Sequence, residues 1–349
     1  MEKPLVSILM PAYNHAKYIR YAIDSAVNQT YENIEIIVSD NGSNDGTAEI
    51  IKSYSDSRIR KHFFLTNTGP ANNGNYCYNM AKGKYLAYLF TDDFWDLTKI
   101  EKQVAVLENN KDLGACFTHA SLINSEGGTS GLDNHPLKRI FFKRNRTQAQ
   151  WLRYFFFHSN CICCPSAMVH NDNKSKENIG NTGNGVSPAL RQLGDFSTWI
   201  QLVKLKPIFI IPEKLTYHRA RDEGGNESTP TRENLIRHAN ENKMILQEFF
   251  DDMPDELFME AFCDDLLKKG ELSTEERLCE QIFLYLKLGS YLNCGNIIAC
   301  EKLYDMFKSP VFTDILSSVY GFTINHFYKL SASYYSFNVA AHVTGELRE

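Results

Sequence analysis

The chain contains the stretch Tyr85-Leu86-Ala87-Tyr88-Leu89-Phe90-Thr91-Asp92-Asp93. Its first six residues are uncharged and rich in aromatic side chains, which indicates a strand buried on both faces. Two adjacent carboxylates follow it, and in an open α/β sheet ligands bind outside the carboxyl ends of the strands. Like charges side by side repel unless a cation or a donor-rich ligand holds them. A divalent metal ion carrying a diphosphate would satisfy both conditions.

Strand and helix patterns alternate on either side of this stretch, which predicts an α/β fold with a mostly parallel sheet and right-handed crossovers. In such a sheet the first, second and fourth strands end at one edge, where the sequence places Tyr13, Asn14, Asp40, Asn41 and the Asp92–Asp93 pair. We expect strands at residues 5–10, 34–38, 59–65, 85–90, 113–123 and 207–211, and helices at 18–27, 48–53 and 72–81.

The bulk composition excludes several classes of protein. The 349 residues are 43% hydrophobic and 23% charged, as in an ordinary globular protein. A net charge of −5 argues against a nucleic-acid binder, which needs a basic face. No segment is apolar enough to span a membrane, and the first residues lead into a strand pattern rather than a secretory signal. The nine cysteines lack zinc-type spacing, so we expect reduced thiols in a cytoplasmic protein.

Two later segments have a character of their own. Residues 136–157 interleave basic and aromatic side chains, which is typical of a partly buried helix with a solvated basic face. The same pattern also suits a surface that contacts an anionic membrane or grips an acidic acceptor. From about residue 231 the spacing is helical, and Ser273-Thr274-Glu275-Glu276 is a capping box. Residues 171–188, rich in Asn, Gly and Ser, indicate a loop between the two.

Three motifs in the first part of the chain resemble the inverting family 2 glycosyltransferases, which have the GT-A fold. The likeness extends to residue 230 and divides the chain into a nucleotide-sugar-binding half (1–112), an acceptor half (113–230) and a helical region (231–349) that it does not cover. Leu193-Gly194-Asp195 resembles the acceptor-side motif of the family, and Leu215-Thr216-Tyr217-His218-Arg219 resembles its closing strand. The three motifs are Val6-Ser7-Ile8-Leu9-Met10-Pro11-Ala12-Tyr13-Asn14, the stretch from Ile37 to Thr47, and the stretch from Gly83 to Asp93.

The resemblance implies a nucleotide-sugar donor, usually UDP-linked, and Mn²⁺ or Mg²⁺ as cofactor. Asp93 would coordinate the metal ion that bridges the diphosphate, with Asp92 in support or on the ribose. The alternative is that these acids cap a helix together with Asp96. Tyr13 would pack on the base or ribose, or simply cap a strand end. The further donor-binding residues would be Pro11, through its backbone, Asp40, Asn41, Asn75 and Arg221.

Asp195 would be the general base that takes the proton from an acceptor hydroxyl as this oxygen attacks the anomeric carbon. The sequence places it at the start of an apolar helix, so the alternative is a plain helix cap. Direct displacement of this kind inverts the anomeric centre, unlike the two-carboxylate route of retaining glycoside hydrolases.

The sequence departs from the family pattern at three places. Phe90 stands where an acid often precedes the metal-site pair, and Asn41 stands where an Asp often accepts a hydrogen bond from uracil. Asn41 could still accept through its carbonyl, but it can also donate. Arg221 replaces a common His; it would clamp phosphate oxygens or be a solvated loop charge. We expect His218 to be structural rather than a ligand.

The leading hypothesis is therefore an enzyme, a hexosyl- or N-acetylhexosaminyltransferase acting on a glycan or lipid-linked acceptor in the synthesis of a surface polysaccharide such as capsule or O-antigen. A peripheral contact with the inner face of the membrane and a homodimer formed through the helical region would accompany it. The alternative is a non-catalytic nucleotide-sugar-binding or scaffold protein of the same fold. A dinucleotide-dependent oxidoreductase is excluded, because Pro-Ala-Tyr-Asn follows the first strand in place of a Gly-x-Gly-x-x-Gly turn.

Overall fold

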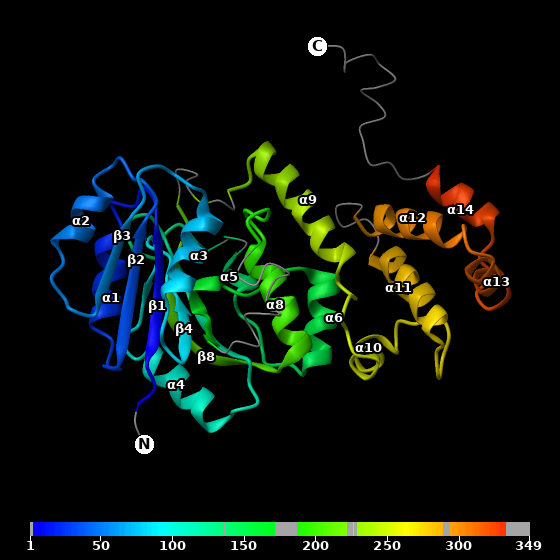
Figure 1. Cartoon of the computed structure of the whole chain (residues 1–349), viewed down its shortest axis with the longest axis horizontal. Coiled ribbons are helices and arrows are strands. Elements are labelled where there is room, and N and C mark those ends of the chain that lie inside the picture. The colour runs from blue at the N-terminus through cyan, green and yellow to red at the C-terminus, as the bar shows by residue number, and fades with distance from the viewer. Residues whose placement is uncertain are drawn as a thin grey trace, which may run out of the picture. The chain divides into compact units, whose positions relative to one another are not determined.

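The computed structural model describes residues 3–133, 135, 137–171, 187–221, 226, 229–288 and 294–332. The chain divides into two compact units, Met1–Asn234 and Leu235–Glu349. Figure 1 shows the sheet of the first unit in blue to green and the helices of the second unit in yellow to red. The loop expected at 171–188 lies, apart from its ends, outside the described residues.

The first unit is built on a mixed sheet of eight described strands in the order β3-β2-β1-β4-β7-β6-β8-β5. Parallel pairing joins β1 to β2 and β4, β2 to β3, and β6 to β8, whereas β7 and β5 pair only in the antiparallel sense. The expected sheet is confirmed. The strands are β1 Val6–Ala12, β2 Ile34–Asp40, β3 Ile59–Phe63, β4 Tyr85–Tyr88, β5 Phe94–Trp95, β6 Ala115–Ile123, β7 Met168–His170 and β8 Ile208–Arg219.

Two strands differ from expectation. β4 ends at Tyr88 rather than Phe90, because the chain turns there and the amide of Asp93 donates to the carbonyl of Phe90 at 3.0 Å. The segments expected as a strand at 207–211 and a closing strand at 215–219 form one continuous strand, β8. Its register against β6 shifts around His119, so a bulge absorbs the residues between the two segments.

Helices cover both faces of this sheet. Val6, Ile8 and Met10 of β1 belong to a buried core with α1, α2 and α4, while α3 packs on β1 and β2. The alternation along β1 explains this, since successive side chains of a strand point to opposite faces. The helices of this unit are α1 Ile19–Val27, α2 Thr47–Ser53, α3 Pro70–Met80, α4 Lys99–Asn109, α5 Leu137–Ile140, α6 Gln148–His158 and α8 Gly194–Leu205, with a 3₁₀ turn at Cys164–Ser166.

The second unit is helical in its described part, as expected. Phe250 contacts the rings of Phe249, Phe258, Phe262 and Tyr285 and forms the centre of its core. The Ser273 and Glu276 side chains each accept the other's amide, which confirms the capping box. The helices are α9 Arg232–Gln247, which begins in the first unit, α10 Asp255–Phe262, α11 Thr274–Leu288, α12 Cys294–Met306, α13 Pro310–Ser318 and α14 Ile324–Ser331. Nowhere in the described residues is a helix long and apolar enough to cross a bilayer.

Candidate active site

The carboxyl ends of β1, β2 and β4 meet at one edge of the sheet. β1 lies between β2 and β4, with Leu9 opposite both Ile37 and Tyr88. Beyond the strands, the amide of Asn41 still donates to Ala12 O at 2.9 Å, and that of Leu89 donates to Leu9 O at 3.0 Å. The polar residues that follow these strands therefore lie along one edge, which confirms the convergence inferred from the sequence.

Asp93 is fully buried and both of its carboxylate oxygens have partners within the chain. Oδ1 accepts from the Arg219 amide at 2.7 Å, and Oδ2 lies 3.1 Å from His218 Nδ1. The antiparallel pairing of β5 with β8 produces this contact, since Phe94 stands opposite Tyr217. His218 is thus a member of the site, contacting the acid on which we expected the metal ion to depend.

The Asp93–His218 contact holds a proton. Burial alone would lower the pKa of His218, but the carboxylates of Asp93 and Asp92 outweigh it and raise that pKa. Burial, together with the charge of Asp92, also raises the pKa of Asp93. The raised pKa of His218 favours an imidazolium that donates from Nδ1 to Oδ2, and the raised pKa of Asp93 likewise favours keeping a proton in this contact.

Asp92 forms an ion pair with Arg221. Its Oδ2 accepts from Arg221 Nη2 at 2.6 Å and from Nε at 3.1 Å, and its backbone carbonyl accepts from Arg219 Nε at 2.8 Å. Burial alone would raise the pKa of Asp92, but the basic groups of His15, Arg221 and His218 lower it. The side chain of Arg221 is only 16% exposed, so the interpretation as a solvated loop charge is wrong.

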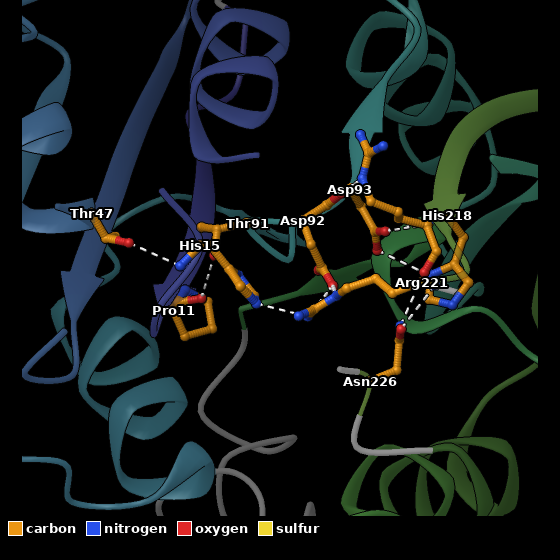
Figure 2. A network of polar contacts seen from close by, with 10 residues as sticks. Pro11, His15, Thr47, Thr91, Asp92, Asp93, His218, Arg221 and Asn226 are labelled. Carbon is orange, nitrogen blue, oxygen red and sulfur yellow. Dashed lines mark hydrogen bonds and ion pairs between the residues drawn. The ribbon is translucent and has the colours of Figure 1, made fainter. Parts of the chain in front are cut away.

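His15 completes the network and was not singled out from the sequence. Arg221 Nη2 lies 2.8 Å from His15 Nε2, and His15 Nδ1 lies 2.7 Å from Thr91 Oγ1. A guanidinium can only donate, so Nε2 must accept and Nδ1 carries the hydrogen. Thr91 in turn donates to the Pro11 carbonyl at 3.3 Å. Figure 2 shows these side chains pointing toward one another from the ends of β1, β4 and β8.

This network already neutralises the two acids. Arg219, Arg221 and protonated His218 face two carboxylates, which leaves one net positive charge. Basic side chains of the protein therefore supply part of the positive charge that the Asp92–Asp93 pair needs. Three of the four carboxylate oxygens accept hydrogen bonds, and Asp92 Oδ1 has none from the described residues. In those residues no group of three His, Cys, Asp or Glu side chains is placed to enclose a metal ion.

Asp195 lies in the first turn of α8 and is half-buried. Its Oδ2 accepts from Asn160 Nδ2 at 3.1 Å, and its Oδ1 accepts from the Phe196 amide at 2.7 Å. Burial raises the pKa of Asp195 to about 6, although these bonds oppose the shift. After burial, the charges of Asp93 and Asp195 both raise the pKa of the Cys163 thiol. Both acids therefore lie near one buried thiol, although 102 positions separate them in the sequence.

The remaining donor-side residues are placed along the same edge. Tyr13 is 41% exposed, and Asp40 is buried with Oδ1 accepting from Ser43 Oγ at 2.5 Å. Asn75 is half-buried on α3, and Asn73 of the same helix bonds to the ends of β1 and β2. Asn73 Nδ2 donates to Ala12 O at 3.2 Å and to Ser39 O at 3.1 Å, a role with no signal in the sequence.

The amide of Asn41 holds the neighbouring loop. Its Oδ1 accepts from the amide and hydroxyl of Thr68, both at 2.9 Å, and its Nδ2 donates to Asn67 Oδ1 and Gly69 O at 2.9 and 3.1 Å. Gly42 permits this approach: it has φ of 72°, and a Cβ there would lie 2.8 Å from the Thr66 carbonyl carbon. In this structure Asn41 shapes the border of the site.

Residues 7–168 match the model of glycosyl transferase family 2. A putative teichuronic acid biosynthesis glycosyltransferase, TuaG of Bacillus subtilis, is 31% identical over 204 residues, which cover 58% of this chain and 73% of that protein. The chain belongs to glycosyl transferase family 2. It spans only 35 to 57% of the length of four other curated relatives, each named as an uncharacterized glycosyltransferase.

Solved structures share the fold of this family 2 member. S. aureus TarS 1–349, in complex with UDP-GlcNAc, has a TM-score of 0.54 at 15% identity and covers 95% of this chain and 93% of its own. The mannosyltransferase PcManGT of Pyrobaculum calidifontis, in complex with GDP-Man and Mn²⁺, has a TM-score of 0.52 at 16% identity and covers 92% and 81%. At this level of identity the likeness establishes the GT-A type fold and no more.

Proposed function

We propose that this family 2 member is an inverting glycosyltransferase that moves a sugar from a UDP-linked donor to a hydroxyl of a glycan or lipid-linked acceptor in surface polysaccharide synthesis. The observation that carries the proposal is the placement of Asp195, an acid with a raised pKa, near the same buried thiol, Cys163, as Asp93 of the Asp93–His218 pair. A base and an anion-binding centre would then serve one reacting centre.

The donor side supports this role through its charge. The net positive charge of the Asp92, Asp93, His218, Arg219 and Arg221 network favours a diphosphate, and an arginine fork suits phosphate oxygens. Arg221 would exchange part of its contact with Asp92 for the diphosphate. Tyr13, exposed at the end of β1, would stack on the base or ribose, and Pro11, Asp40, Asn41 and Asn75 would contact the same part of the donor.

The carboxylates fit a divalent metal ion that the donor brings with it. Mg²⁺ and Mn²⁺ commonly combine one or two carboxylates with substrate phosphates and water rather than an all-protein cage. Asp92 Oδ1 is the oxygen that the described residues leave free, so Asp92 would hold the ion directly, with Asp93 behind it. The ion would stabilise the charge that develops on the leaving diphosphate.

Asp195 would act on the acceptor. As the acceptor oxygen forms its bond to the anomeric carbon, the bond from that carbon to the diphosphate breaks and Asp195 takes the hydroxyl proton. A base with a pKa near the working pH combines adequate ionisation with good proton affinity. The Asn160 hydrogen bond would hold the carboxylate in position throughout.

The proposal predicts nucleotide release from a UDP-sugar in the presence of Mn²⁺. A panel of UDP-, GDP- and dTDP-sugars would be incubated with glycan and lipid-linked acceptors, and the released nucleotide measured. We expect release from UDP-sugars to rise with an acceptor and to stop when EDTA is added. A chain that binds these donors but releases no nucleotide with any acceptor would support the non-catalytic alternative.

Donor affinity, measured separately by calorimetry, tests the role of Arg221. Arg221→Gln should weaken donor binding about tenfold to a hundredfold, because a charge-assisted hydrogen bond contributes about 1.5–3 kcal/mol. Arg221→Lys keeps the positive charge but lacks the forked guanidinium, so its donor affinity should lie between those of the wild type and Arg221→Gln. Equal affinity in all three proteins would contradict the assignment.

The pKa of Asp195 predicts the pH dependence of the reaction. The base must be ionised, so kcat/KM should fall tenfold for each pH unit below about 6, where protonated Asp195 predominates. An Asp of ordinary pKa, about 3.9, would leave the rate flat over this range. Asn160→Ala removes a bond to the charged form and should move the acid limb to higher pH. An unmoved limb in that variant would assign the limb to another group.

A further inference from the structure

A group of basic side chains surrounds Tyr154 on α6. Arg146 Cζ lies 4.5 Å and Lys143 Nζ lies 5.3 Å from the centroid of the Tyr154 ring, and the ring of His158 lies 4.7 Å from it. These four residues are called the Tyr154 cluster below. Arg146 also lies over the buried ring of Trp151, at 4.7 Å. Cation–π contacts of this kind hold the charges close together.

The cluster has an excess of positive charge. Among the residues that the structure describes, Lys143 and Arg146 form no ion pair, whereas Lys84, Lys102 and Lys138 are each paired with an acid. After burial, the charges of Arg153, Lys143 and Arg146 lower the pKa of His158. Mutual repulsion of this kind is relieved when an anion binds between the cations.

The backbone that carries the cluster is fixed before any ligand arrives. His119, at the bulge of β6, lies with Nε2 3.1 Å from Lys143 O. Asn145 bonds both backbone groups of Ile210 on β8, accepting from its N at 2.6 Å and donating to its O at 2.9 Å. Thr147 and Gln150 form a capping box that starts α6. A preformed site loses less entropy on binding than a mobile one.

The cluster adjoins the proposed base. α6 ends at His158, and two residues later Asn160 donates to Asp195. Between them Ser159 has φ of 61°, which is uncommon for a residue other than glycine. Burial raises the pKa of Cys161, and the charges of Lys143 and Arg146 oppose this shift, so they lie near the start of the segment that reaches Asp195.

We propose that the Tyr154 cluster binds an anionic group, a carboxylate or phosphate, on the acceptor glycan. The inference rests on the proposed function, because it assigns the acceptor of the same site as anionic. A lysine, an arginine and a histidine around one ring could bind such a group while a neighbouring hydroxyl of the glycan reaches Asp195. The cluster would thus select the acceptor by charge, and the donor side would remain independent of it.

A glycan fits this surface better than a membrane does. A helix that lies on a bilayer inserts an exposed apolar face beneath its basic one. Most apolar side chains of α6 instead point into the protein: Ala149, Trp151, Leu152, Phe155 and Phe156 are buried, and Phe157 is half-buried. Phe142, ahead of the helix, is 39% exposed, and a single exposed ring does not make an apolar face. The interpretation of residues 136–157 as an acceptor contact is therefore favoured over a membrane anchor.

The test is the binding of tetragalacturonate, with its neutral methyl ester as the matched ligand, measured by calorimetry without donor. We expect the acid to bind and the ester not to bind. Arg146→Gln and Lys143→Gln should each weaken binding about tenfold or more, because the loss of one charge-assisted bond has that effect. Arg144 is exposed and lies in the same segment, but it is not one of the residues around the Tyr154 ring. Arg144→Gln should therefore change the affinity less than about twofold.

Several outcomes would overturn the inference. Equal binding of acid and ester, or equal loss in Arg144→Gln and Arg146→Gln, would show that the cluster does not recognise charge. Recognition of phosphate is tested in the same way with glycerol 3-phosphate, and glycerol is its neutral control. If neither tetragalacturonate nor glycerol 3-phosphate binds, the proposed site is contradicted. Cosedimentation with equimolar phosphatidylglycerol–phosphatidylcholine vesicles that depends on Lys143 and Arg146, without glycan binding, would assign the surface to a membrane.

The two proposals fail separately. Asp195→Asn should bind tetragalacturonate like the wild type, since the base is not part of the cluster. Nucleotide release without anion binding would reject the cluster and keep the transferase. Anion binding without release from any donor would reject the transferase and, with it, the assignment of the bound anion as an acceptor. Arg146→Gln loses the packing of Arg146 on Trp151 and so risks failing to fold. If it does, Lys143→Gln still tests the cluster.

Discussion

Asp195→Asn is expected to lower turnover about a hundredfold to ten-thousandfold, the usual contribution of a general base. An amide cannot take the proton from the acceptor hydroxyl, so attack on the anomeric carbon loses its assistance. The fold should not suffer, because the Asn side-chain oxygen can still accept from the Phe196 amide. Donor affinity should not change either, since no bond between described residues joins Asp195 to Asp92, Arg221 or His15.

The measurement combines nucleotide release with acceptor and donor binding by calorimetry. Asp112→Asn is the matched control: it makes the same chemical change at an exposed acid in the turn between α4 and β6. Full turnover in Asp195→Asn would reject the assignment of the base. Loss of donor binding in step with turnover would instead point to a collapsed site.

Asp93→Ala should have the largest effect on stability, lowering the free energy of unfolding by about 3–5 kcal/mol. The substitution leaves the protonated His218 and the Arg219 amide buried without their acceptor. For a unit of this size the midpoint of thermal unfolding should fall by about 6–20 °C. Asp93→Asn keeps an acceptor for the amide but loses the charge, so its midpoint should lie between those of the wild type and Asp93→Ala.

The pH dependence of this loss identifies its cause. His218 has a raised pKa in the folded protein, so its pairing stabilises the fold fully below the unfolded value of about 6.5 and less as the pH rises through the folded value. The gap between the wild type and Asp93→Ala should therefore narrow in alkaline solution. Asp112→Ala, at an exposed acid, should shift the midpoint very little. A gap independent of pH would argue for lost packing instead of a lost ion pair.

The strands that could be predicted are those with a clear local pattern of apolar residues in the sequence. The run Tyr85–Tyr88 is apolar because both faces of β4 are covered, and β1 and β2 show the same signal. The strand order and the antiparallel β5 and β7 could not be derived. β5 has two residues and β7 has three, too few for any periodicity to appear.

The sequence by itself determined that Asp92 and Asp93 follow a buried strand and that Asp195 opens a helix, because each depends on residues within one or two turns of it. Only the tertiary structure decided what those acids contact. Arg221 and His218 reach Asp92 and Asp93 from 129 and 125 residues away, and His15 joins them across 206. These contacts arise from the pairing of β5 with β8 and of β1 with β4, and pairings between distant strands leave no trace in local composition. The two adjacent acids indicated that positive charge must lie nearby, and in the folded structure basic residues of the same chain provide part of it.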